Sequence, residues 1–300
     1  MTKIIFIFIG AFFLMLSVFS GGLELNGAQQ MIICLSLIIV LGIPHGAIDN
    51  ILFLKKHRVS KLKFYVYYLT TIVGNILMWL WMPLLSFLFF IGISAYHFGQ
   101  SQYAHHIVKE KLSDKFLFFS WGLAVLSGLL FFNAEEISLL ITTVQEFNVF
   151  GVSSYKNLVA VSFYTSLGLV FIFYILKYFS NAFKLETIFT ELFTLGLIFM
   201  GFYVFPLLVG FTLYFVILHS IKVLQEEYDF VKTQRIIDSG LSFVKLLAPY
   251  TLLSIIGISL LFAAIHYEVL QISYAYCILI LISSITVPHA YVMERFYKTN

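Results

Sequence analysis

The sequence predicts an all-α fold, a polytopic membrane bundle of about ten transmembrane helices. Of its 300 residues, 61% are hydrophobic and only 11% are charged, whereas a soluble domain carries about a quarter charged residues. The net charge of +3 is small and scattered along the chain, which argues against a nucleic-acid partner. No soluble domain, low-complexity linker or internal repeat is recognisable. We therefore expect residues 1–300 to form a single integral-membrane domain.

Ten apolar runs are long enough to cross a bilayer, which requires about 20 mostly apolar residues. They cover, in chain order, residues 3–20, 28–54, 62–82, 83–104, 115–133, 156–179, 185–205, 206–224, 242–265 and 270–296. The first run resembles a signal peptide, but it is long and no small-x-small cleavage site follows, so we interpret it as a spanning helix. Pro83 and Pro206 mark two tight junctions, and we expect residues 135–149 to lie in the membrane interface.

The charges of the loops support this arrangement. When the ten helices alternate in direction, every lysine and arginine except Lys156 falls on the same side of the membrane. Cytoplasmic loops of membrane proteins carry an excess of basic residues. The pattern therefore predicts a multi-pass protein of the cell membrane with both termini in the cytoplasm.

Four of the eight histidines lie in the second halves of predicted helices that all run in the same direction, namely His45, His97, His219 and His289. Ionisable side chains at membrane depth are costly and indicate a functional role. We therefore predict that these four imidazoles meet at one metal ion. The other four fall in loops or at helix ends, where we expect solvated or interfacial side chains: His57, His105, His106 and His266.

Imidazole suits iron, copper, zinc and nickel, and helical bundles build metal sites from side chains on facing helices. No cysteine lies near the histidine motifs, and we expect Cys34 and Cys277 only to pack. A site of three or four histidines at membrane depth favours non-haem iron that keeps positions open for dioxygen. Two alternatives remain at this point. Haem would use the same histidines in two pairs, and four unrelated core imidazoles would need no metal.

Polar residues near the histidines fit a metal site. Asp49 lies four residues after His45, on the same helix face, and is a candidate acceptor for the ring N–H of a ligand histidine. Tyr96 and Gln100 lie beside His97 in sequence and could serve similarly. The alternative for each is an ordinary polar residue near a helix end.

Proline and glycine also flank the histidines. Pro44 and Pro288 each precede a histidine and remove one helical hydrogen bond. This frees the carbonyls of Val40 and Ser284, which could accept from an imidazole. Gly42, Gly46 and Gly99 would let neighbouring helices approach closely. Glycine that serves packing alone is the alternative interpretation.

Aromatic residues make up 18% of the chain, which is a high share. A long apolar tunnel for a polyene or an isoprenoid would use such rings for contact area and offset stacking. Ordinary lipid-facing phenylalanine explains most of them equally well.

Four motifs resemble the Brp/Blh family of membrane-embedded β-carotene 15,15'-dioxygenases. They are GIPHGAID at residues 42–49, YHFGQSQ at 96–102, YFVILHS at 214–220 and VPH at 287–289. They follow the order of the family over about four-fifths of the chain, and the first two are specific.

The resemblance implies cleavage of the central double bond of β-carotene by O2, with Fe(2+) as cofactor and two molecules of all-trans retinal as products. It also implies a lipid-soluble carotenoid substrate and hand-off of the product to a rhodopsin. The iron ligands of the family carry over to His45, His97 and His219. Many members have a further histidine where this chain has Val223. We expect His289 to complete the set; the alternatives are three histidines with water or another group, or an altered activity.

Other function classes make different predictions. A di-iron desaturase would need about eight histidines in HxxxH and HxxHH clusters, a pattern this chain lacks. A di-haem electron carrier would show a Soret band. A transporter without catalysis would bind no stoichiometric metal and would usually contain repeats.

Overall fold

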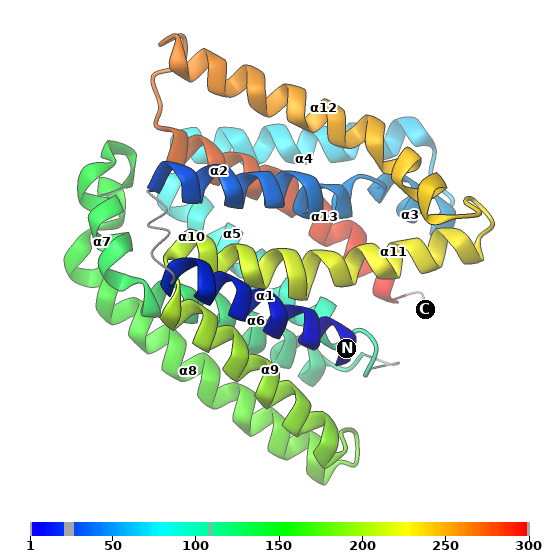
Figure 1. Ribbon diagram of the computed structural model, residues 1–300. Coiled ribbons are helices and arrows are strands. Elements are labelled where there is room, and N and C mark those ends of the chain that lie inside the picture. Colours follow the sequence, from blue (N-terminus) through cyan, green and yellow to red (C-terminus); the bar gives the residue numbers. More distant parts are fainter. Residues whose placement is uncertain (1, 21–26, 108–109, 299–300) are drawn as a thin grey trace. The chain divides into compact units, whose positions relative to one another are not determined.

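A computed structural model describes residues 2–20, 27–107 and 110–298 of the chain. Lys109, one of the loop lysines in the predicted charge pattern, lies outside these ranges. The described residues form helices and no strand (Figure 1). Nine of the described helices are long and apolar enough to cross a membrane. The predicted fold class, an all-α polytopic bundle, is confirmed.

The helices follow the predicted runs closely. In chain order they are α1 (Thr2–Ser20), α2 (Gly27–Leu37), η1 (Ile38–Gly42), η2 (Ile43–Gly46), α3 (Asp49–Lys56), α4 (Lys61–Trp81), α5 (Pro83–Tyr103), α6 (Leu112–Phe132), α7 (Ala134–Thr143), η3 (Gln145–Phe150), α8 (Val152–Phe179), α9 (Leu185–Val204), α10 (Leu207–Thr212), η4 (Leu213–Ser220), α11 (Ile221–Thr233), α12 (Gly240–His266) and α13 (Tyr274–Lys298). The apolar part of α1, Lys3–Val18, is shorter than the nine spanning candidates. The predicted interfacial segment 135–149 forms α7 and η3.

Two runs predicted as continuous helices change their winding at a histidine. In the first, the π-helix η1 and the 3-10 helix η2 separate α2 from α3, and His45 lies in η2. Pro44 has no backbone N–H to donate to a helical hydrogen bond. The backbone N–H of Ile43, just before it, donates to the carbonyl of Ile38, five residues earlier. In the second, the π-helix η4 separates α10 from α11 and contains His219. Departures from the α-helix of this kind often occur at functional sites.

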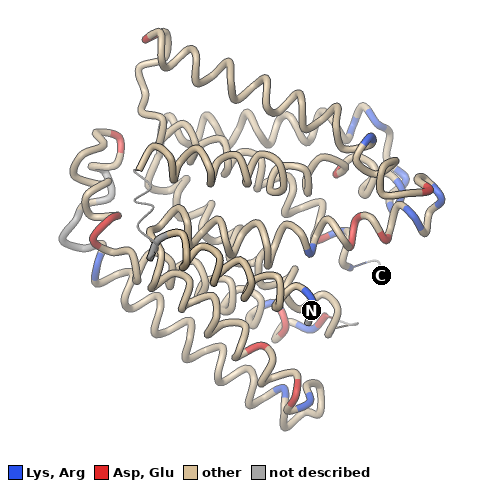
Figure 2. The backbone as a smooth tube through the Cα atoms, viewed as in Figure 1, with Lys and Arg blue, Asp and Glu red and all other residues tan. Residues whose placement is uncertain are grey.

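Charged residues concentrate near the ends of the long helices, as Figure 2 shows. In α8, for example, Lys156 and Lys177 lie near the two ends, and residues 157–176 between them carry no charge. A segment of this length without charge suits the hydrocarbon core of a bilayer. The structure therefore agrees with the composition in describing a membrane protein.

The chain divides into two compact units, and the first comprises Met1–Ile48 with Glu191–Ser259. Within it, α1 packs beside η4, and the ring of Phe12 meets that of Phe205 edge to face, with centroids 5.2 Å apart. Gly42 allows η1 to lie against η4, because a Cβ atom at this position would lie 2.9 Å from Cε1 of Phe215. The predicted role of Gly42 in close helix approach is confirmed.

The second unit comprises Asp49–Thr190 with Leu260–Asn300. In this unit the backbones of α5 and α6 approach each other closely. A Cβ atom added to Gly99 would lie 1.9 Å from the carbonyl oxygen of Phe118, and one added to Gly122 would lie 1.8 Å from that of Ala95. Only glycine fits at either position, so the predicted role of Gly99 is confirmed. Because His97 lies two residues from Gly99, this contact helps to fix the position of His97.

Helices α4 and α13 pack against each other in the same unit, and buried hydrogen bonds join them. The amide of Asn75 donates to the hydroxyls of Ser283 and Ser284 at 3.0 Å each, and the indole N–H of Trp79 donates to Ser283 at 2.6 Å. The hydroxyl of Tyr276 donates to the carbonyl of Trp79 at 3.0 Å. Because such bonds replace water contacts that an apolar environment cannot offer, they hold α13 in a defined register against α4.

Candidate metal centre

The first unit brings two of the predicted ligand histidines together. His45 on η2 and His219 on η4 are both buried, and their ring centroids lie 5.3 Å apart at an interplanar angle of 88°. Nδ1 of His45 donates to the carbonyl of Gly42. The sequence led us to expect an acceptor freed by Pro44 at Val40, and the 3-10 winding of η2 provides Gly42 instead. With its proton on Nδ1, a neutral imidazole carries its lone pair on Nε2.

Phenylalanine rings extend the first pair along η4. The ring of Phe215 stacks on that of His219 with centroids 5.7 Å apart, and Phe211 stacks on Phe215 at 5.2 Å. Phe215 also meets the ring of His45 edge to face at 5.6 Å. Both phenylalanines are half-buried. Together with His219, a candidate ligand, they form a stack of rings along α10 and η4, which we call the Phe211–Phe215–His219 column.

The second unit brings together the other two histidines. His97 on α5 and His289 on α13 are buried, with ring centroids 5.0 Å apart at an interplanar angle of 83°. A ring nitrogen of His97 lies within 4.8 Å of one of His289. Helix α13 continues through Pro288, so His289 lies on a regular helical turn.

Asp49 lies beside the second pair. Its Oδ1 is 2.9 Å from Nδ1 of His289, and its Oδ2 accepts the hydroxyl hydrogen of Tyr68 at 2.9 Å. An ionised carboxylate only accepts hydrogen bonds, so Nδ1 of His289 carries the proton and Nε2 carries the lone pair. A carboxylate that orients a histidine in this way is the usual support of a metal ligand. Asp49 follows His45 in sequence, yet the histidine it contacts is His289.

Within each pair, the two imidazoles have a spacing that suits binding to one metal ion. Two imidazoles that bind one ion at about 2.1 Å through a ring nitrogen have ring centroids about 4.5 to 5.5 Å apart. The centroid distances of 5.3 Å and 5.0 Å fall in this range. In His45 and His289 the Nδ1 atom contacts an oxygen acceptor, which leaves Nε2 as the donor atom for a metal. The histidines present therefore fit a metal of the kind that imidazole prefers.

The other two residues predicted to support the ligands contact different partners. The ring of Tyr96 meets Phe118 edge to face at 6.1 Å. Gln100 is buried, and its amide donates to Oε1 of Glu110 at 3.0 Å. That bond joins the end of α5 to the segment that leads into α6.

Sequence reasoning missed Tyr68. It lies in a tyrosine-rich stretch of α4 together with Tyr65 and Tyr67. Hydroxyl-bearing rings in a spanning helix are a weak signal of polar partners, since an apolar environment favours buried hydroxyls that find an acceptor. Nothing in the sequence pairs residue 68 with residue 49.

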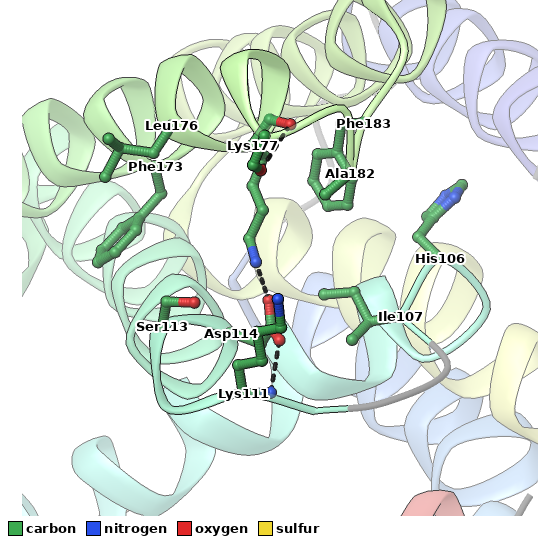
Figure 3. Close-up of a pocket in the computed structure, with 11 residues that line it drawn as sticks. His106, Ile107, Lys111, Ser113, Asp114, Phe173, Leu176, Lys177, Ala182 and Phe183 are labelled. Carbon is green, nitrogen blue, oxygen red and sulfur yellow. Dashed lines mark hydrogen bonds and ion pairs between the residues drawn. The ribbon is translucent and has the colours of Figure 1, made fainter.

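A cavity of about 380 Å³ lies apart from these pairs, between the start of α6 and the end of α8. Figure 3 shows Lys177 pointing from α8 toward Asp114 on α6, where the two form a buried ion pair. Asp114 also accepts from the backbone N–H of Lys111 at 2.7 Å. The described residues that line the cavity include His106 but none of the four histidines of the predicted site.

The fold and the buried imidazole pairs together define a class: a helical membrane protein with a candidate metal centre made of histidines. The family model for beta-carotene 15,15'-dioxygenase matches residues 36–297, and the chain belongs to this family. The matched range contains both histidine pairs as well as Asp49 and Tyr68. Comparisons with curated proteins and with solved structures gave no match.

Membership of this family confirms the resemblance seen in the sequence motifs. It supports a dioxygenase that acts on a carotene, and it suggests a metal cofactor. The apolar helices agree with a substrate that dissolves in lipid.

Proposed function

We propose that this protein cleaves the central 15,15' double bond of β-carotene with O2 and releases two molecules of all-trans retinal. The reaction balances without a reductant, because each oxygen atom of O2 ends in one aldehyde. The observation that carries the proposal is the pair of buried histidines His97 and His289, oriented by Asp49 in a chain of the dioxygenase family.

We further propose that Fe(2+) is held by His45, His97, His219 and His289. When bound, iron supplies the chemistry that activates O2. The chain positions the donors: Gly42 and Asp49 hold two of the imidazoles with Nε2 as the donor atom. His45 and Asp49 are four positions apart in the sequence, a span of at most about 14 Å when fully extended. His289 takes the place of the further family histidine, which is Val223 here.

The substrate has no polar handle, so we propose that aromatic contacts position it. β-Carotene would enter from the bilayer and lie along the Phe211–Phe215–His219 column, in which the two phenylalanines are half-buried. Ring faces suit a flat conjugated chain because of their contact area and stacking geometry. Holding the central bond next to the ligand His219 would then contribute most of the rate enhancement, since orientation is the main service the protein can offer an apolar substrate.

We also propose that the protein spans the cell membrane several times with both termini in the cytoplasm. This follows from the loop lysines and arginines. The proposed product is also lipid-soluble, so it would leave through the bilayer and could pass to a rhodopsin.

A colour assay tests the proposed function. The full chain is expressed in a bacterium that accumulates β-carotene, and retinal is measured by chromatography. We expect bleaching of the cells and about two retinal molecules for each β-carotene consumed. His45→Ala should abolish the reaction because it removes a proposed ligand, whereas His266→Ala, at an exposed helix end, should leave it unchanged.

Cells that stay orange and make no retinal while the protein is present in the membrane would refute the enzyme assignment. A Soret band in the purified protein would identify haem in place of non-haem iron. Full activity of His45→Ala would remove that residue from the ligand set.

A further inference from the structure

We infer that Tyr68 is a positioning residue of the metal centre, which it influences through Asp49. The inference rests on the proposed function, because it concerns the same site, but it assigns a role to a residue that acts on a proposed ligand only through another side chain. The residues form a chain of contacts, in which Tyr68 donates to Oδ2 of Asp49 and Oδ1 of Asp49 accepts from His289.

The geometry gives each oxygen of the carboxylate a separate partner. Both contacts are 2.9 Å long, and Asp49 and His289 are each 3% exposed. A buried carboxylate with one bonded oxygen could rotate about its Cβ–Cγ bond and present either oxygen to the imidazole. The hydroxyl of Tyr68 holds Oδ2, and this leaves Oδ1 aimed at His289. Tyr68 thereby helps to fix the orientation of the His289 imidazole, although it contacts only Asp49 of the two.

Tyr68 lies on a helix that is itself fixed against the helix carrying His289. It lies on α4 on the same helical face as Asn75 and Trp79, which donate to Ser283 on α13, the helix that carries His289. Its ring packs against Phe64 with centroids 5.5 Å apart. The donor and the histidine thus belong to two helices that are fixed against each other by separate hydrogen bonds.

Neighbouring contacts provide a matched control. Tyr65 lies three residues before Tyr68 on the same helix, and its hydroxyl accepts from the side-chain amide of Asn50 at 2.9 Å. Both tyrosines therefore join α4 to α3 through one hydrogen bond, but only Tyr68 contacts Asp49. A general weakening of the contact between these helices would appear in both variants, whereas a positioning role would appear only at Tyr68.

The test measures metal affinity of the full chain. Wild type, Tyr68→Phe, Tyr65→Phe, Asp49→Asn and the double variant Asp49→Asn/Tyr68→Phe are loaded with Fe(2+) without O2 and titrated with a competing chelator. Metal content is compared in isolated membranes as well as in detergent, so that a variant that unfolds only in detergent is still measured. We expect Tyr68→Phe to bind about tenfold more weakly, within the usual range for supporting residues, and Tyr65→Phe to match wild type.

Non-additivity distinguishes positioning from a structural role. If Tyr68 acts through Asp49, the double variant should bind no more weakly than Asp49→Asn alone. Equal affinity of Tyr68→Phe and wild type, or losses that add in the double variant, would overturn the inference. A wild-type chain that binds no metal would overturn it together with the iron proposal, whereas a chain that binds metal but forms no retinal would overturn the proposed function alone.

Discussion

Lys177 is a cation inside an apolar helix, and its position depends on one carboxylate. It is buried on α8, and its ammonium group pairs with Asp114 on α6, which is 2% exposed. Asp114 in turn receives the backbone N–H of Lys111 at the start of α6. A buried ion pair adds little net stability, because desolvation offsets the attraction, but removal of one partner leaves the other charge buried without compensation.

The pair therefore predicts an asymmetric pattern of stability. Lys177→Met should lower the free energy of unfolding by about 3 to 5 kcal/mol, because Asp114 is left charged and buried. The double variant Asp114→Asn/Lys177→Met should recover most of this loss. Thermal unfolding in detergent measures both, and a double variant as unstable as the single one would contradict the explanation.

At the scale of single residues, the sequence predicted which histidines would be buried but not what orients them. Helix direction and depth placed His97 and His289 together with the other two as a group. The acceptor of the His289 N–H could not be predicted, because Asp49 is 240 residues away in the chain. Periodicity reports which face of a helix a residue occupies, and it carries no information about partners on distant helices. Tyr68 was missed for the same reason.

At the scale of elements, the winding of two helices decides where histidines point. A π-helical turn contains more residues than an α-helical turn, so each residue after it lies on a different face from the one a regular helix would give. Hydropathy detected the runs 28–54 and 206–224 as apolar segments but could not detect η1 or η4 within them. Pro44 indicated that the helix would be irregular near η1 and η2. The residues of η4 itself, Leu213–Ser220, include neither proline nor glycine, so the sequence did not indicate the second irregularity.

The contact between α5 and α6 makes a prediction that concerns a pair of helices. Gly99→Ala should lower stability by about 3 kcal/mol or more, because its methyl group would overlap the carbonyl oxygen of Phe118 and force the helices apart. Gly92 lies on the same helix, and a methyl group added there would meet no neighbouring atom within 4 Å, so Gly92→Ala should be neutral or slightly stabilising. The midpoint of thermal unfolding distinguishes the two, and equal midpoints would refute the packing argument.

At the scale of the whole molecule, composition and length were the strongest guides. The low share of charged residues and the spacing of apolar runs predicted an all-helical membrane protein, and nine spanning candidates among the described residues agree. Helix α12 illustrates why this succeeds, since only 6% of its apolar window is buried inside the protein. Its apolar side chains suit contact with lipid, and hydropathy measures that property directly.

The proposed orientation can be tested by chemical labelling. Arg58 and Glu136 are exposed, and the charge pattern assigns them to opposite sides of the membrane. The native thiols Cys34 and Cys277 are buried and should react slowly. We expect a membrane-impermeant maleimide to label Glu136→Cys in intact cells and Arg58→Cys only after permeabilisation. The reverse pattern would place both termini outside the cytoplasm.

The distance in sequence between Asp49 and His289 has a consequence for biosynthesis. A ribosome adds about 5 to 20 residues per second, so the 240 residues that separate the two take about 12 to 50 s to translate. During that time Tyr68, only 19 residues after Asp49, is the partner the nascent carboxylate can reach. An aspartate inside a bilayer without a partner costs about 2.5 to 3.5 kcal/mol on insertion scales. Early capture by Tyr68 would lower this penalty until α13 has been inserted.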